Sequence, residues 1–249
     1  MKAAKSGSAL QGRRIVITRP AEKARRLADR LRTLGAVPIE FPTVKIEPAQ
    51  SGPIDAALRA LDTFDWVVFT SANGVEAVFG RLASAGKDAR DLGRRKVAAI
   101  GPVTAQALRE RGVEPALVPA EYVAEAILAS LGEVRGLRFL LPRADIAREA
   151  LAAGLRDRGA VVTEVTAYRT VGAAGPPPDL SGADAVTFTS SSTVRHFLAS
   201  GAAVGTAKVV CIGPVTARTA RELGLTVAAV ADEYTEDGLI QALEGALST

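Results

Sequence analysis

The sequence predicts an α/β fold with two similar lobes, each a parallel sheet flanked by helices, and with the lobes joined by a two-stranded β-ladder hinge. Short apolar runs alternate with amphipathic segments along most of the 249 residues, which is typical of α/β units with right-handed crossovers. Two loop motifs also occur twice, and one segment of this repeat has changed its place in the chain order.

The repeated motifs lie where an apolar run meets an amphipathic one. Phe69 begins the sequence FTSANG, and Phe188, 119 residues later, begins FTSSST. Ile100 and Ile212 are 112 residues apart, and each begins the sequence IGPVTA. A similarity that spans about half the chain indicates two copies of one unit, so two lobes of ordinary domain size are expected.

One copy of the repeat is a circular permutation of the other. Three residues near the start of the chain recur 124 residues later: Arg19, Gly35 and Glu40 correspond to Arg143, Gly159 and Glu164. The chain is therefore expected to begin in one lobe, cross to build the other, and return. The expected parts are a disordered extension over 1–12, domain A over 13–41 and 172–249, domain B over 46–165, and hinge strands over 41–46 and 165–171. The hinge strands should lie side by side, with a cleft between the lobes.

Apolar runs and the residues that interrupt them predict the elements of the first half. A strand over 14–18 precedes a helix over 24–34, in which leucines recur at helical spacing and Gly35 is the stop signal. Pro38 and Pro42 make 37–46 an edge or connecting strand. Further strands are expected over 65–70, 96–100, 115–118 and 137–141, and helices over 55–61, 71–83, 102–112, 121–131 and 147–158.

The second half repeats these elements. Strands are expected over 185–189, 209–212 and 227–230, with helices after Ser190 and Gly213, and the pair Glu233-Tyr234 mirrors Glu121-Tyr122. The almost continuous apolar character of 65–70 is that of a parallel strand covered on both faces. The segment 172–182, with three consecutive prolines, is expected to be a loop between the copies.

Composition excludes several classes of function. The 31 Lys and Arg against 27 Asp and Glu give a net charge of +4, which suits either ordinary solubility or a basic cleft for an acidic ligand. One cysteine and one histidine argue against an internal disulfide and a metal site, and a cytoplasmic protein is expected. Phosphate-loop and dinucleotide motifs are absent from the sequence, aromatics are only 4%, and no apolar run reaches membrane-spanning length. We expect neither nucleotide cofactor, nucleic acid nor membrane as partner.

The four strand-to-helix loops are the candidate binding elements. Backbone amides at the start of a helix are unpaired and favour an anion, and in open α/β sheets such loops gather at the carboxyl ends of the strands. Small side chains here would let a carboxylate approach the backbone. The candidates are Ser71, Ala72, Asn73, Gly74, Gly101, Thr104, Ser190, Ser191, Ser192, Gly213 and Thr216. The alternative is plain helix capping, for which the same residue types are favoured.

Three further positions stand out. Arg19 and Arg143 are lone arginines at expected strand exits, suited to a carboxylate ligand or to an ion pair within the protein. Tyr168 carries an ionisable hydroxyl in the second hinge strand, where it could act or simply pack. His196 has no partners of a catalytic constellation in sequence, and Cys211 lies in an apolar strand as a core residue.

The order of these motifs resembles the uroporphyrinogen-III synthase family. The similarity extends from about residue 12 to residue 247, and it is carried by ITRP at Ile17, FTSANG at Phe69, both IGPVTA loops, AYRT at Ala167 and FTSS at Phe188. The resemblance implies a monomeric two-lobed enzyme without metal or organic cofactor. It implies a substrate, hydroxymethylbilane, that is a linear tetrapyrrole with eight carboxylates, and transient contact with hydroxymethylbilane synthase.

The resemblance also implies a reaction. The hydroxyl of hydroxymethylbilane leaves as water, and the resulting azafulvene is attacked by the substituted carbon of the last pyrrole. The spiro intermediate then fragments and recloses with ring D inverted. Tyr168 matches the family's candidate for assisting departure of the hydroxyl, and the serine and threonine loops match its cleft-lining loops. The second copy departs from the first at Ser192-Thr193, where the first has Asn73-Gly74.

Two other classes of function remain open at this point. A two-lobed protein could bind or sense an acidic small molecule without catalysing its conversion. A sugar- or nucleotide-binding scaffold is supported only by analogy of fold.

Overall fold

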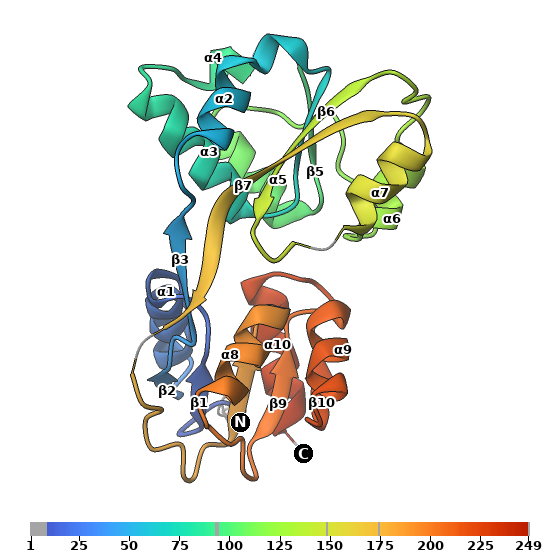
Figure 1. The fold of residues 1–249 in the computed structure, drawn as a ribbon. Coiled ribbons are helices and arrows are strands. Elements are labelled where there is room, and N and C mark those ends of the chain that lie inside the picture. The colour runs from blue at the N-terminus through green and yellow to red at the C-terminus, as the bar shows by residue number, and fades with distance from the viewer. Residues whose placement is uncertain (1–8, 93–94, 148, 174, 249) are drawn as a thin grey trace, which may run out of the picture. The chain divides into compact units, whose positions relative to one another are not determined.

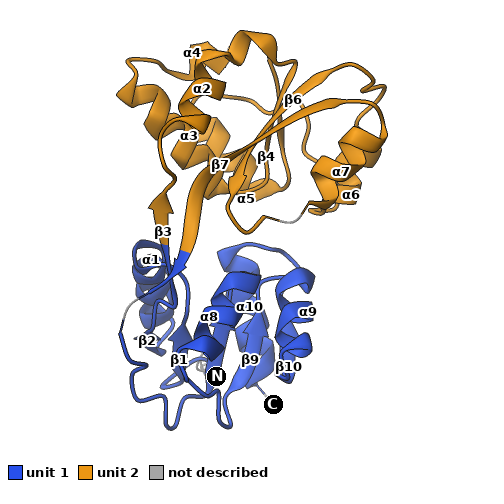
Figure 2. Cartoon of the chain, viewed as in Figure 1, with its two compact units in different colours: residues 1–45, 171–249 blue, residues 46–170 orange. Residues whose placement is uncertain are grey.

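The computed structural model describes residues 9–92, 95–147, 149–173 and 175–248. The chain divides into two compact units, shown in different colours in Figure 2. Unit 1 comprises residues 1–45 and 171–249, and unit 2 comprises residues 46–170. Unit 1 is therefore built from both ends of the chain, and unit 2 from its middle.

Unit 1 is a five-stranded sheet with the order β10-β9-β8-β1-β2, and its four strand pairings are parallel (Figure 1). Its strands are β1 (Arg14–Ile17), β2 (Val37–Glu40), β8 (Ala185–Phe188), β9 (Lys208–Cys211) and β10 (Val227–Val230). Its helices are α1 (Ala21–Thr33), α8 (Ser191–Ala199), α9 (Pro214–Glu222) and α10 (Glu236–Leu247). The strand with Pro38, β2, lies at the edge of the sheet, as its proline requires.

Unit 2 has the sheet order β3-β7-β6-β4-β5, in which β7-β6, β6-β4 and β4-β5 are parallel. Its strands are β3 (Val44–Pro48), β4 (Trp66–Phe69), β5 (Lys96–Ala99), β6 (Arg138–Ala144) and β7 (Val161–Gly172). Its helices are α2 (Pro53–Arg59), the 3-10 helix η1 (Leu61–Thr63), α3 (Ala72–Ser84), α4 (Ala89–Leu92), α5 (Pro102–Glu110), α6 (Ala124–Ser130) and α7 (Ala150–Asp157).

The two sheets have corresponding strand orders. In the repeat, β1, β2, β8 and β9 correspond to β6, β7, β4 and β5, and each set runs in the same order across its sheet. The permutation seen in the sequence thus changes the order in which the strands follow one another along the chain, but not their order across the sheet. The predicted fold class, two α/β lobes with parallel sheets flanked by helices, is confirmed.

Strands β3 and β7 carry the chain between the units, and they are neighbours in the sheet. The amide of Ala49 donates to Ala167, and the amide of Ala173 donates to Thr43. Between these two bonds the residue number rises from 43 to 49 along the β3 side and falls from 173 to 167 along the β7 side, so β3 and β7 run antiparallel. Because β7 is 12 residues long, it extends beyond its neighbours, and it bears Tyr168.

Both faces of each sheet are covered by apolar side chains. In unit 1, α1 and α10 pack on one face around Leu27 and Leu243, and α8 and α9 pack on the other around Phe197 and Ala217. In unit 2, α2, α3 and α5 cover one face, and α6 and α7 the other. Sites for a ligand are therefore expected at the carboxyl edges of the sheets, where the strand-to-helix loops begin.

Four local predictions are wrong. Part of the disordered extension expected over 1–12 is packed, because Leu10 is fully buried and the Gly12 amide donates to Gly35; residues 1–8 lie outside the described residues. The segment 115–118 forms only an isolated bridge between Leu117 and Ala98. Arg143 is not at a strand exit, because β6 continues through it to Ala144 by pairing with the long β7. The single strand expected over 37–46 is two strands, β2 and β3.

Candidate functional site

Tyr168 on β7 meets the loop between β4 and α3. Its side chain is 7% exposed, and its hydroxyl lies 2.9 Å from Ser71 Oγ. Ser71 is the N-cap of α3, where its Oγ accepts a hydrogen bond of 3.1 Å from the amide of Gly74. Because that bond uses an acceptor position of Oγ, the hydroxyl proton of Ser71 is available to the tyrosine oxygen. The structure thus brings together two residues that lie 97 positions apart.

Burial raises the pKa of Tyr168, because an ionised phenolate would lose its hydration. Hydrogen bonds from Ser71 and Asn73 act in the opposite direction, and the charge of Asp145 adds to the rise. The phenol is therefore neutral at physiological pH. Donors already placed at its oxygen would stabilise the phenolate formed when the phenol gives up its proton, which is an arrangement suited to a general acid.

The first turn of α3 contains the remaining candidates of this loop. Ala72 is the first residue of the helix, and Asn73 and Gly74 follow it. A Cβ atom at Gly74 would lie 3.2 Å from the backbone oxygen of Pro142. The glycine therefore lets α3 approach β6 closely, which gives it a packing role whether or not a ligand binds there.

The corresponding loop of unit 1 has a network of hydroxyls. Ser190 caps α8 by accepting from the amide of Thr193, and its Oγ lies 2.9 Å from Ser192 Oγ. Ser191 Oγ lies 2.7 Å from Thr219 Oγ1 on α9. The capping alternative is thus real for Ser190, while the three serines also form a polar edge next to the start of α8.

The two exit glycines are each covered by a tyrosine. A Cβ atom at Gly101 would lie 3.1 Å from Tyr122 Cγ, and one at Gly213 would lie 3.3 Å from Tyr234 Cδ1. The Cβ face of each glycine is thus filled by an aromatic ring and not open to a ligand. The tyrosines of the repeated Glu-Tyr pairs explain these glycines, which the sequence interpretation had assigned to ligand approach.

Thr104 and Thr216 occupy the third positions of α5 and α9. Each residue is only 4% exposed, and neither hydroxyl makes a hydrogen bond with the residues that the structure describes. Their hydroxyls remain candidates for a ligand oxygen, and their burial would fix the direction in which they point.

The two candidate arginines are ion-paired. Arg19 Nη1 lies 2.6 Å from Glu236 Oε1. Arg143 pairs with Glu164 and donates to the backbone oxygen of Ala147 at 2.9 Å. The ion-pair alternative is therefore realised at both positions. A role in ligand binding would have to act through these pairs.

The sequence interpretation missed the residues around Glu236. Arg26 and Arg30 on α1 also approach its carboxylate. Their spacing of four residues on a predicted helix, soon after Arg19, was a signal that could have indicated a shared face. Glu236 could not have been placed there, because it follows Arg19 by 217 residues.

Neither a metal site nor a membrane segment is found in the part of the chain that the structure describes. No group of three or more His, Cys, Asp or Glu side chains is arranged to hold a metal ion within the described ranges. None of the described helices has the length and apolar character needed to cross a membrane.

Comparison with known proteins assigns the chain to a family. The model of the family described as uroporphyrinogen-III synthase HemD matches residues 25–241. The chain belongs to the uroporphyrinogen-III synthase family. A relative in Synechococcus elongatus, a uroporphyrinogen-III synthase, is 38% identical over 94% of this chain and 96% of the relative. A Methanothermobacter thermautotrophicus protein described as a putative uroporphyrinogen-III synthase is 34% identical over 92% and 96%.

Solved structures of uroporphyrinogen-III synthases share the fold. A mutant enzyme from Thermus thermophilus has a TM-score of 0.69 and 23% identity, covering 95% of this chain and 99% of that one. The Helicobacter pylori enzyme has a TM-score of 0.62 and 20% identity, with coverage of 95% and 99%. The sequence resemblance to this family is confirmed.

Proposed function

We propose that this chain is a uroporphyrinogen-III synthase, which cyclises hydroxymethylbilane to uroporphyrinogen III with loss of water and inversion of ring D. The family match over residues 25–241 supports the reaction class. The observation that carries the mechanism is the buried Tyr168 hydroxyl, 2.9 Å from Ser71 Oγ at the start of α3. The product would feed the biosynthesis of haem or related tetrapyrroles.

Tyr168 is the general acid in this mechanism. Its phenol gives a proton to the leaving hydroxyl, the carbon–oxygen bond breaks, and water departs, which leaves a positively charged azafulvenium and a phenolate. Ser71 and Asn73 stabilise the phenolate through their hydrogen bonds, which also lower the cost of ionising a buried phenol. The proton lost when the closed macrocycle regains its pyrrole ring returns to the phenolate. Each turnover thus ends with neutral Tyr168.

In each unit, the strand-to-helix loops are suited to bind carboxylates of the substrate. First-turn amides of α3, α5, α8 and α9 that no N-cap side chain accepts from offer hydrogen bonds, and the hydroxyls of Thr104 and Thr216 and the serines of the Ser190 loop supplement them. Arg19 and Arg143 are each held in an ion pair, with Glu236 and Glu164, and would contribute to binding only through these pairs. Holding a flexible chain in a curled conformation supplies much of the rate advantage, because it removes conformational freedom before the reaction.

We further propose a monomeric cytoplasmic enzyme that needs no metal or organic cofactor. The large apolar side chains that are exposed in the described residues are few and come from separate segments of the chain, which disfavours a broad subunit interface; they are Val37, Val103, Val118, Ile146, Val161 and Leu223. Cys211 is buried and free, as suits a reducing compartment. A transient contact with hydroxymethylbilane synthase would limit spontaneous cyclisation of the substrate to the type I isomer.

An isomer assay tests the function. Purified protein is given freshly generated hydroxymethylbilane, and the oxidised products are separated into type I and type III uroporphyrin. We expect mostly type III with the protein and type I in its absence. A product mixture equal to that of the protein-free reaction would exclude the enzyme and favour a binding or sensor protein for an acidic small molecule.

A further inference from the structure

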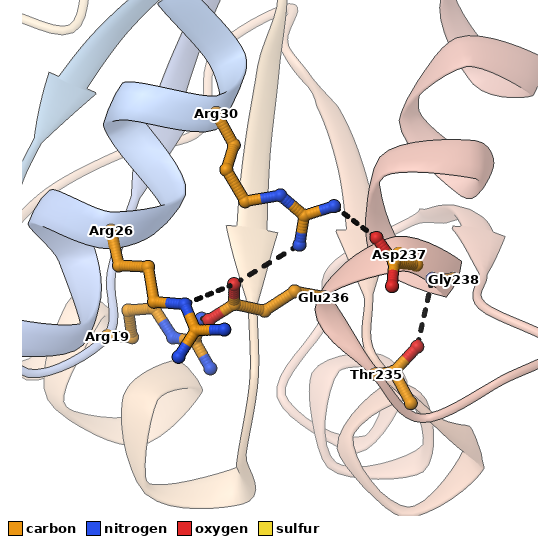
Figure 3. Close-up of polar contacts among 7 residues, drawn as sticks. All are labelled: Arg19, Arg26, Arg30, Thr235, Glu236, Asp237 and Gly238. Atoms are coloured by element: carbon orange, nitrogen blue, oxygen red, sulfur yellow. Dashed lines mark hydrogen bonds and ion pairs between the residues drawn. The ribbon is translucent and has the colours of Figure 1, made fainter.

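Three arginines surround one glutamate at the start of α10 in unit 1, as Figure 3 shows. Glu236 is the first residue of α10. Its Oε1 accepts from Arg19 Nη1 at 2.6 Å, and its Oε2 accepts from Arg30 Nη1 at 3.3 Å. Arg26 Nε lies 3.7 Å from the same Oε2. One carboxylate thus holds the guanidinium groups of Arg19 and Arg30 by hydrogen bonds and lies near that of Arg26.

The cluster carries more positive than negative charge. Arg30 pairs with Asp237 as well as with Glu236, so three guanidinium groups face two carboxylates. The side chain of Arg26 is 80% exposed and makes no hydrogen bond with the described residues, which leaves its donors open to solvent. The positive end of the α10 dipole lies at the same place. An additional carboxylate would complete the charge balance.

The cluster is not arranged for stability alone. The side chain of Arg19 is only 11% exposed, and its Nε is buried without a hydrogen-bond partner among the described residues. Burial lowers the pKa of Arg19, and Glu236 opposes that effect only in part. A buried ion pair with an unsatisfied donor is weak support for folding, because apolar residues would avoid the cost of desolvation.

The duplication provides an internal comparison. At the repeat separation of 124 residues, Arg19, Arg26 and Arg30 correspond to Arg143, Ala150 and Gly154. At the separation of 112 residues, Glu236 corresponds to Ala124. Of the four residues of the cluster, unit 2 therefore retains only one arginine at the corresponding position. Both units form the same sheet topology without needing the same cluster. The fold therefore does not require the cluster, which has been added to one unit or lost from the other.

We propose that Arg26 and Arg30 form a carboxylate-binding site for one acidic side chain of the tetrapyrrole. The inference rests on the proposed function, because that function supplies the carboxylate-rich ligand. Guanidinium groups match carboxylates through paired N–H donors, and the position of Glu236 shows that a carboxylate fits among these side chains. Glu236 is a positioning residue for Arg30, and Arg19 fixes Glu236 through its ion pair; neither touches the ligand.

The test uses the double variant Arg26→Gln/Arg30→Gln and the control Arg32→Gln. Arg32 lies on the same helix, but it pairs with Asp29 at 2.7 Å and with Glu40 at 3.3 Å, away from Glu236. Glutamine keeps the helix propensity and removes the charge. The full chain is titrated with uroporphyrin III, which has eight carboxylates, by fluorescence at low and high salt. Steady-state kinetics with hydroxymethylbilane, product isomers and thermal unfolding are measured on the same proteins.

We expect the double variant to bind uroporphyrin III about 10-fold more weakly than the wild type and to raise KM by a similar factor, as for two charge-assisted contacts near a surface. Its kcat and isomer ratio should stay within about twofold, its melting temperature should stay unchanged, and its affinity should depend less on salt. Arg32→Gln should bind like the wild type. Should the double variant prove unstable, Arg26→Gln alone, at the exposed arginine, is expected to show the same trend.

The outcomes separate the two proposals. Equal uroporphyrin affinity in the wild type and the double variant would overturn the arginine site, even in an enzyme that forms the type III isomer. An equal loss in Arg32→Gln would also overturn it, because the effect would then be one of net charge. A wild type that binds uroporphyrin through this site but forms only the type I isomer would overturn the proposed function and leave the site standing.

Discussion

Replacing Tyr168 by phenylalanine removes a single oxygen atom from the candidate site. The ring would keep its packing in the apolar cluster of unit 2, where Tyr168 is 7% exposed. The change deletes the hydrogen bond of 2.9 Å to Ser71 Oγ and the proton that we assign to the leaving hydroxyl. Ser71 would still accept from the amide of Gly74, so the start of α3 should keep its cap.

The two losses have different expected sizes. A neutral hydrogen bond contributes about 0.5–1.5 kcal/mol to the free energy of unfolding, which is small beside the roughly 5–15 kcal/mol of a typical domain. Removal of a general acid typically lowers turnover by about 10²- to 10⁴-fold. At about 1.36 kcal/mol per tenfold in rate, that corresponds to roughly 3–5 kcal/mol of barrier. A loss of stability alone therefore cannot reproduce the expected loss of rate.

The assay measures kcat, KM and product isomers for Tyr168→Phe, with Tyr234→Phe as the matched control. Tyr234 contacts Gly213 through ring atoms that phenylalanine retains. We expect kcat of Tyr168→Phe to fall at least about 100-fold with KM within a few-fold, by the general-acid estimate above, and the control to retain most of its turnover. Ser71→Ala should give an intermediate loss of about 10-fold, because it removes one donor from the phenolate but leaves the acid.

The pH dependence provides a second readout. Burial raises the pKa of Tyr168, so the phenol should remain protonated through the neutral range and beyond the ordinary tyrosine value of about 10. Wild-type kcat should therefore show no loss from this group as pH rises from about 7 to about 9.

A kcat of Tyr168→Phe close to that of the wild type, with the type III isomer still formed, would refute the assignment and leave Tyr168 a packing residue.

Two further predictions concern pH and reactivity. The hydrogen bond from the Arg14 amide, and after it the one from the Arg13 side chain, lowers the pKa of Asp184. The ionised Asp184 should therefore stabilise the fold above pH of about 4, and this stabilisation should be lost as pH falls below that value. Asp184→Asn should lower the melting temperature by roughly 2–4 °C at neutral pH, with a difference that shrinks toward pH of about 3, whereas the control Asp62→Asn, at an exposed position, should not lower it. Burial raises the pKa of Cys211 to about 12, so a thiol reagent at pH of about 8 should react on the order of 10³-fold more slowly with native protein than with unfolded protein; equal rates would contradict this.

Local patterns were sufficient to predict the fold because each unit repeats strong signals. The apolar run of β4, the N-cap at Ser71 and the proline at the first position of α5 each depend on neighbouring residues, and the structure has them as predicted. The errors came from tertiary pairing. β6 continues through Arg143 because the long β7 lies beside it. The segment 115–118 pairs with β5 only at the bridge between Leu117 and Ala98, so it does not form a strand.

The candidate site was less accessible to sequence reasoning than the fold. Loop residues were found because their types recur in the repeat, but their partners are set by the fold: Tyr122 and Tyr234 fill the faces of the exit glycines, and Glu236 neutralises Arg19. Each of these contacts joins residues that are far apart in sequence. The small residues of a loop therefore do not reveal by themselves whether they leave room for a ligand or for a neighbouring side chain.

The duplication makes the differences between the units more informative than their similarities. Features that both units share, such as a tyrosine over an exit glycine, fit a requirement of the common topology. Two arrangements occur in one copy only. At the repeat separation of 124 residues, Tyr168 corresponds to Val44, which has no hydroxyl, and Arg26 and Arg30 correspond to Ala150 and Gly154, which carry no charge. A pseudo-symmetric scaffold must become asymmetric to distinguish one end of a linear tetrapyrrole from the other, so a residue that acts on a single hydroxyl is expected in one copy and not in both.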